Sequence, residues 1–142
     1  MTLKITNRIK EIEQVHFQLN DYVKTLPLSD NDRKKIYITV DEILSNIISY
    51  GYEDNLPHTI EVRFETSEGD LVMEFIDDGK HFDPVYFIHH NVPKIHPDGD
   101  QNGGLGLHLV YRLMHQMQYK RQDNLNKLKI SLKLADNILE KK

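Results

Sequence analysis

The stretch Asp41–Tyr52, DEILSNIISYGY, places the strongest constraint on the fold of this chain. Within and just before it, apolar residues recur every three or four positions, which predicts a helix with one buried face. These residues are Ile36, Val40, Ile43, Ile47 and Tyr50. Glu42 and Asn46, four positions apart, lie side by side at the border of that face. Such groups cost roughly 1–3 kcal/mol each when buried without partners. They therefore form either an ordinary solvated border, the interpretation favoured by this stretch alone, or a site for a metal or polar ligand.

Clear start and stop signals surround this helix. Ser29 followed by Asp32 resembles a capping box at its start, and Gly51 is placed to end it. Before it, residues 1–6 predict a short strand, and residues 7–26 predict a helix capped by Asn7 that stops before Pro27.

Alternating apolar residues after Gly51 predict strands at Thr59–Thr66 and Asp70–Asp77, which form a hairpin. Residues 78–103 hold three of the five prolines and read as a long loop, which in a compact domain is functional or disordered. After Gly103-Gly104 comes an apolar helix, whose residues are Leu105, Leu107, Leu109, Val110, Leu113, Met114 and Met117. A second hairpin follows around Asp123-Asn124, with strands at Gln118–Gln122 and Leu128–Leu134.

The predicted order is β-α-α-β-β-loop-α-β-β. We expect an α/β two-layer sandwich, with a mixed, mostly antiparallel sheet and the helices on one face. At 142 residues, and with no linker or repeat, the chain predicts a single domain over 1–142.

Composition narrows the function classes. The absence of cysteine excludes disulfides, zinc–thiolate sites and a thiol nucleophile. A net charge of −4, with dispersed basic residues, argues against nucleic acid as the main partner. No apolar run is long enough for a membrane span, and the N-terminus lacks a signal-peptide core. We therefore expect no membrane association and a cytoplasmic location.

Two further segments carry candidate binding chemistry. Asp77, which ends a strand two residues before Gly79, can point its carboxylate into a pocket and accept from an exocyclic amine such as that of adenine. Gly103-Gly104-Leu105-Gly106-Leu107 opens a helix, where backbone N–H groups can bind an anion. It is neither a Walker A loop nor a dinucleotide fingerprint. Each segment alone is more often an ordinary turn or helix start.

Taken in their order along the chain, the motifs resemble the N, G1 and G2 boxes of the GHKL ATPase/kinase superfamily. The order is Glu42 with Asn46, then Asp77-x-Gly79, then a long loop, then Gly104-Leu105-Gly106-Leu107. The resemblance spans nearly the whole chain and implies a Bergerat-type ATP-binding fold. Within the superfamily, the short length, Phe82-Asp83-Pro84 and the stretch GGLGLHLV resemble the single-domain anti-sigma factor serine/threonine kinases.

The resemblance implies a role for each matching residue. Glu42 would be the general base, and Asn46 would be the Mg²⁺ ligand. Asp77 would bind the adenine amine, Gly79 would allow close backbone approach, and residues 85–102 would form the ATP lid. The remaining residues implied in nucleotide binding are Tyr50, Phe82, Gly103, Gly104, Leu105, Gly106 and Leu107.

The chain also departs from the family pattern. His81 stands where a second glycine is usual, which predicts a tighter pocket mouth or a different lid hinge, and Tyr50 replaces a histidine. Lys94 is the one firm cation of the predicted lid. Lys129 aligns with the threonine that supports the adenine-binding aspartate in many relatives. The histidines of this segment, His89, His90 and His96, fit no standard zinc spacing and are interpreted as solvated loop residues.

By resemblance, the chain is expected to be an ATP- and Mg²⁺-dependent serine/threonine kinase. It would phosphorylate a STAS-type anti-sigma factor antagonist and bind a sigma factor or another regulated protein, with a homodimer also open. The alternatives are a kinase-inactive module in which ATP selects a protein partner, and a slow ATPase.

Overall fold

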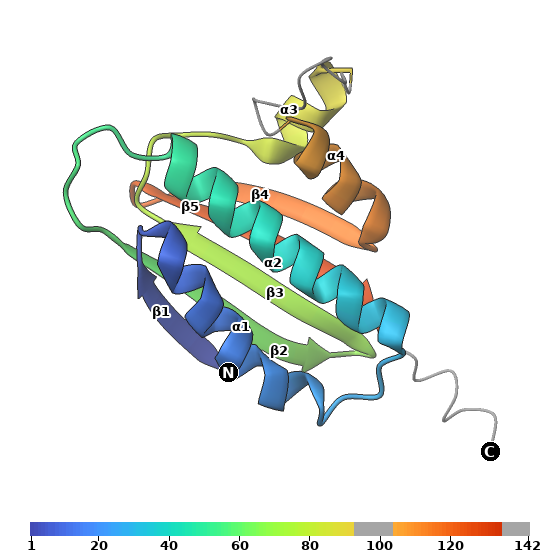
Figure 1. Cartoon of the computed structure of the whole chain (residues 1–142). Helices are drawn as coiled ribbons and strands as arrows, with labels where there is room; N and C mark the ends of the chain where they lie inside the picture. Colours follow the sequence, from blue (N-terminus) through green and yellow to red (C-terminus); the bar gives the residue numbers. More distant parts are fainter. Residues whose placement is uncertain (93–103, 135–142) are drawn as a thin grey trace, which may run out of the picture.

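The structure, a computed structural model, describes residues 1–92 and 104–134, which form one antiparallel sheet with helices over one face (Figure 1). The strand order is β1-β2-β3-β5-β4, and every neighbouring pair is antiparallel. The strands are β1 (Thr2–Thr6), β2 (Thr59–Ser67), β3 (Asp70–Asp77), β4 (Gln116–Gln122) and β5 (Leu125–Lys133). The two-layer α/β prediction is confirmed, although the described strands contain no parallel pair. No helix in these residues combines the length and apolar content that crossing a bilayer requires.

The organising helix is α2 (Asp30–Tyr50). Ser29 caps it as predicted, since its Oγ accepts from the backbone N–H of Asp32 at 3.0 Å. Ile36, Val40 and Leu44 are fully buried in the core beneath the helix, so the apolar stripe is confirmed at its centre. The stripe becomes exposed toward the C-terminal end, where Tyr50 is 45% exposed. The last turn of α2 therefore leaves the core and is available to a site.

The first helix is shorter than predicted. A 3₁₀ turn (Ile9–Glu11) precedes α1 (Ile12–Val23), which packs beside α2 on the same face of the sheet (Figure 1). Asn7 does not cap the helix. Its Oδ1 accepts from the His58 backbone N–H at 2.8 Å and its Nδ2 donates to the Leu56 carbonyl at 3.2 Å. The amide instead ties the end of β1 to the segment that enters β2.

The segment 78–103, which was predicted to be a loop throughout, contains a short helix in its first half. Residues Pro84–His90 form α3, a helix that the sequence analysis missed. Asp83 caps this helix, because its Oδ1 accepts from the backbone N–H groups of Val85 and Tyr86 at 2.9 and 3.0 Å. The next helix, α4 (Gly104–Leu113), ends earlier than predicted, so that Met117 is buried in β4.

The β4–β5 hairpin turns at Asp123 and Asn124, whose φ angles of 56° and 62° place both in the left-handed region. That turn was predicted, but both strands begin earlier than expected, at Gln116 and Leu125. The resulting register sets Asn126 directly opposite Asp77 on the central strand β3. This pairing decides which residues surround the predicted adenine-binding carboxylate.

Candidate functional site

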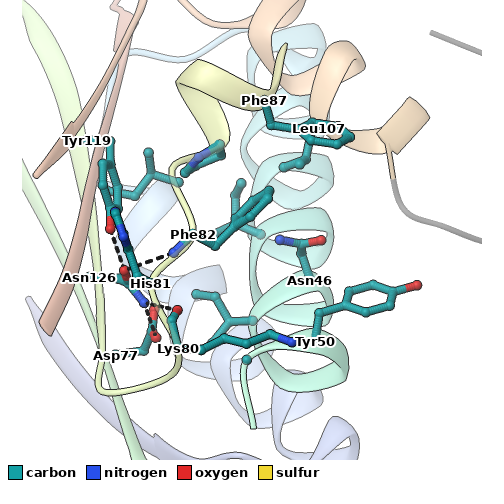
Figure 2. A pocket seen from close by; sticks show the side chains of 15 residues that line it. Asn46, Tyr50, Asp77, Lys80, His81, Phe82, Phe87, Leu107, Tyr119 and Asn126 are labelled. Carbon is teal, nitrogen blue, oxygen red and sulfur yellow. Dashed lines mark hydrogen bonds between the residues drawn. The ribbon is translucent and has the colours of Figure 1, made fainter. Parts of the chain in front are cut away.

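A cavity of about 300 Å³ opens between the C-terminal half of α2, the turn after β3, and α4 (Figure 2). Five of the predicted site residues line it: Asn46, Tyr50, Asp77, Phe82 and Leu107. They come from three segments distant in the sequence, so the fold brings the three predicted motifs to one place.

Asn46 is half-buried on α2, and its side chain points into the cavity (Figure 2). Within residues 1–92 and 104–134, its amide makes no hydrogen bond. An amide that is held by a helix, faces a cavity and makes no hydrogen bond to any described residue is available to a ligand or to a hydrated cation.

Asp77 is the most deeply buried carboxylate of the site, with 5% of its surface exposed. Its Oδ1 accepts from the Gly79 backbone N–H at 2.8 Å and from Asn126 Nδ2 at 3.0 Å. Burial raises the pKa of this carboxyl, while the hydrogen bonds from Asn126 and Gly79 oppose the rise. Oδ2 has no hydrogen-bond partner in the part of the chain that the structure describes, which leaves it for a donor in the cavity.

Gly79 lies where no side chain fits. A Cβ built there would meet the Gly51 carbonyl oxygen at 2.8 Å and Asp77 Oδ1 at 2.9 Å. The next backbone N–H, that of Lys80, donates to the same Gly51 carbonyl at 2.9 Å. The turn is thus tied to the C-terminal end of α2, and Gly79 serves this close packing rather than lining the cavity itself.

The first turn of α4 faces α2. Leu107 is buried against the cavity, and Leu105 is 36% exposed outside the cavity lining. A side chain at Gly106 would overlap the Glu42 carboxylate, so Glu42 lies against the start of α4 and not in the cavity lining. Gly104 opens the helix, and Gly103 lies outside the described residues.

His81 and Phe82 form part of the cavity wall. The His81 ring stacks on Tyr119, with centroids 5.9 Å apart, beside Asp77 and Asn126 (Figure 2). Phe82 packs at a tilt against Phe87, at 5.7 Å between centroids. The residue that replaces the usual glycine is therefore held against β4 by stacking.

The sequence comparison assigns the family. Residues 5–132 match the histidine kinase-like ATPase domain. This chain belongs to that family. Its members share the GHKL-type ATP-binding fold, so the chain is an ATP-binding domain of that superfamily.

The serine/threonine-protein kinase BtrW of Bordetella bronchiseptica is 27% identical to this ATPase domain over 99 residues, which cover 70% of this chain and 69% of that protein. Among solved structures, the blue-light activated histidine kinase of Erythrobacter litoralis EL346 shares 17% identity at a TM-score of 0.50. That match covers 74% of this chain but only 31% of the histidine kinase, so the present chain spans about a third of its length. The histidine kinase AdeS of Acinetobacter baumannii matches over 94% of this chain and 68% of its own, with 18% identity and a TM-score of 0.49.

The sequence analysis misplaced the residue that supports Asp77 in this ATPase domain. Lys129 pairs with Glu74 in the middle of the strands, and Asn126 supports the aspartate instead. The register is shifted because β5 begins at Leu125. One signal was present in the sequence: Asn126 is polar but continues the buried alternation of Leu128, Ile130 and Leu132.

The prediction that His89 and His90 lie in a loop was wrong, whereas the expectation that both are solvated is confirmed, because both side chains are exposed. Both lie on α3, where each Nδ1 is within 2.8 Å of the carbonyl oxygen four residues earlier. His89 also contacts the Tyr111 hydroxyl at 3.1 Å. His96 and Lys94 lie outside the described residues, as does most of the predicted lid over 85–102.

Proposed function

We propose that this chain is an ATP-dependent serine/threonine protein kinase of the partner-switching type, acting in the cytoplasm. It would phosphorylate a serine of a STAS-type anti-sigma factor antagonist, and bind a sigma factor or another regulated protein, as a monomer or homodimer. One observation carries the proposal: the Asn46 amide on α2 and the buried Asp77 carboxylate at the end of β3 face one cavity, beside the glycine-rich start of α4. The similarity to BtrW supports the choice of a serine/threonine kinase.

The cavity suits an adenine ring at its inner end. Asp77 Oδ2 can accept from the exocyclic amine, and an acceptor at that ring position would meet the carboxylate unfavourably. Apolar wall residues, Ile43, Phe82 and Leu107 among them, can contact the faces of the base. The phosphates would then extend toward the first turn of α4, where backbone N–H groups lack helical partners.

The family implies Mg²⁺, and Asn46 fits the requirement. Mg²⁺ is held through one or two protein oxygens, keeping several waters and taking further ligands from phosphates. Asn46 supplies one such oxygen on a rigid helix. When bound, the ion would neutralise phosphate charge.

Glu42 is proposed as the general base, one turn before Asn46 on α2. Its carboxylate would take the proton from the serine hydroxyl as the serine oxygen bonds to the γ-phosphorus and the bond to the β-phosphate oxygen breaks, which releases ADP. The position of Glu42 against Gly106 places this carboxylate beside the start of α4, the end of the site where the phosphates are expected.

The test is to incubate the protein with Mg-ATP and its cognate antagonist, and to follow phosphoserine by mass spectrometry. We expect stoichiometric serine phosphorylation, lowered about 10²–10⁴-fold in Glu42→Gln. Glu65→Gln, which changes an exposed acidic residue of β2 that is not in the cavity lining, serves as the matched control. Phosphorylation that is absent, or equal in Glu42→Gln, would contradict the kinase assignment.

One observation favours a second candidate, a module that binds ATP as a switch for partner selection without transferring phosphate. Among the cavity-lining residues that the structure describes, Lys80 is the one lysine or arginine, and its Nζ lies 3.2 Å from Glu53 Oε2. The described part of the site thus offers phosphates little positive charge. Titration calorimetry showing Mg²⁺-dependent ATP binding, together with no phosphoserine and no ADP release, would select this candidate over the kinase and over a slow ATPase.

A further inference from the structure

Three side chains of the β4–β5 hairpin converge on the turn that follows Asp77. They are Tyr119 and Arg121 from β4 and Asn126 from β5. The hydrogen bonds that these side chains make to the turn and to each other lie at one edge of the cavity, where Figure 2 shows Tyr119, Asn126 and Asp77 close together. Sequence reasoning assigned none of the three to the site.

Asn126 is the hub of this cluster. Its Nδ2 donates to Asp77 Oδ1 at 3.0 Å and to the Lys80 carbonyl at 2.9 Å. Its Oδ1 accepts from the Tyr119 hydroxyl at 2.5 Å and from Arg121 Nη1 at 3.0 Å. With both ends of the amide engaged, Asn126 cannot turn over without breaking contacts on each side, so its NH₂ group stays directed at Asp77.

Arg121 adds a second hold on the same turn. Its Nη1 also donates to the Gly79 carbonyl at 3.0 Å, while the Gly79 N–H donates to Asp77 Oδ1. The Arg121 guanidinium therefore holds both groups that donate to Asp77: the backbone at Gly79, through its carbonyl, and the Asn126 side chain, through its Oδ1. Both donors engage Oδ1, so the arrangement aims Oδ2 at the cavity.

The charge of Arg121 acts in the same direction as its geometry. The guanidinium is half-buried and lowers the pKa of Asp77, opposing the larger effect of burial. An ionised Asp77 is a pure acceptor, which is the form that an exocyclic amine requires.

We infer that Arg121 is a positioning residue for base recognition. It acts through Gly79 and Asn126 to fix the Asp77 carboxylate, the acceptor that selects an amino group over a carbonyl at the purine 6-position. The inference rests on the proposed nucleotide site. It extends that site by assigning base selectivity to a side chain that itself is not part of the cavity lining.

The test compares the affinities of ATP and ITP, in which a carbonyl replaces the amine, by titration calorimetry. In Arg121→Met we expect the ATP dissociation constant to rise about tenfold and that of ITP by less than about twofold, so that the ATP preference shrinks. Arg121→Lys keeps the charge and one donor and should restore part of the preference. Lys120→Met removes the adjacent exposed charge as a control and should behave as wild type.

The outcomes separate the two claims. If Arg121 serves only the fold, Arg121→Met loses thermal stability and weakens ATP and ITP by the same factor, which would overturn the inference. An unchanged preference in Arg121→Lys and Arg121→Met would overturn it as well. A wild-type protein that binds neither nucleotide, or binds both equally, would instead contradict the proposed adenine site.

Discussion

Asp77 shows what a single buried carboxylate, proposed to bind adenine, costs the fold. Asn at this position retains an oxygen that can accept from Gly79 and Asn126, but it removes the charge whose burial raises the pKa. We expect Asp77→Asn without nucleotide to melt at or above the wild-type temperature at pH 7, and to lose most of its ATP affinity.

The sign of the pH dependence follows from the raised folded-state pKa. Above that pKa, Asp77 is ionised in the folded wild type, which then carries the full cost of a buried charge. Below the ordinary value of 3.8, Asp77 is protonated in both the folded and the unfolded wild type, and this cost is absent. The advantage of Asp77→Asn should therefore shrink as the pH falls between these limits. Melting curves by circular dichroism check this, and a variant less stable than wild type at pH 7 would contradict it.

Gly106 offers a second test at this scale, because an added Cβ overlaps the Glu42 carboxylate. Gly106→Ala must displace the Glu42 carboxylate from its place beside the start of α4, where the phosphates are expected, and we expect weaker ATP binding. Glu42→Ala in the same chain vacates the space and should restore part of the affinity. Calorimetry on the two single variants and the double variant measures this coupling, and strictly additive losses would show that the contact is unimportant.

At the scale of elements, two helix caps of the same kind should have different consequences. Ser29 caps α2, which carries the core, whereas Asp83 caps α3, a helix of seven residues. Ser29→Ala should lower the free energy of unfolding by about 1 kcal/mol, with Ser29→Thr as the conservative control. Asp83→Ala should speed amide exchange within α3 and leave global stability nearly unchanged, since so short a helix has little stability of its own. Urea unfolding and hydrogen exchange distinguish the two effects, and equal global losses would contradict the distinction.

The elements also show what the sequence could predict. The hairpin of β2 and β3 was predicted to within a residue, because its apolar alternation is a local signal. The helix α3 was missed, since seven residues that include a proline and two histidines give no clear helical period. The start of β5 was placed too late, because Asn126 and Lys127 look like loop residues until their strand partners are known.

The residues of the candidate site likewise fall into those with a local sequence signal and those without one. Glu42, Asn46, Asp77 and the glycines could be predicted because the residues of each motif lie close together in the sequence, and the fold brings most of them to one cavity or its border. Tyr119, Arg121 and Asn126 were not found, because their role depends on the register of a hairpin against a strand some forty residues earlier. Spacing within a motif does not carry that information.

For the fold as a whole, the pairing of β3 with β5 has a consequence for the conformational entropy of the chain that connects them. Asp77 and Asn126 are neighbours across the sheet, so the chain that carries α3 and α4 between β3 and β4 is an excursion that leaves the sheet and returns to it. The entropy of closing such an excursion grows only logarithmically with its length, about 0.6 kcal/mol for each doubling.

Inserting a few Gly-Ser residues between α3 and α4 should therefore change the free energy of unfolding by less than about 0.6 kcal/mol, as measured by urea titration. A loss of several kcal/mol would show that this connection is packed as part of the core. Fold stability is then almost independent of the length of the connection between α3 and α4, and the same sheet can carry connections of many lengths.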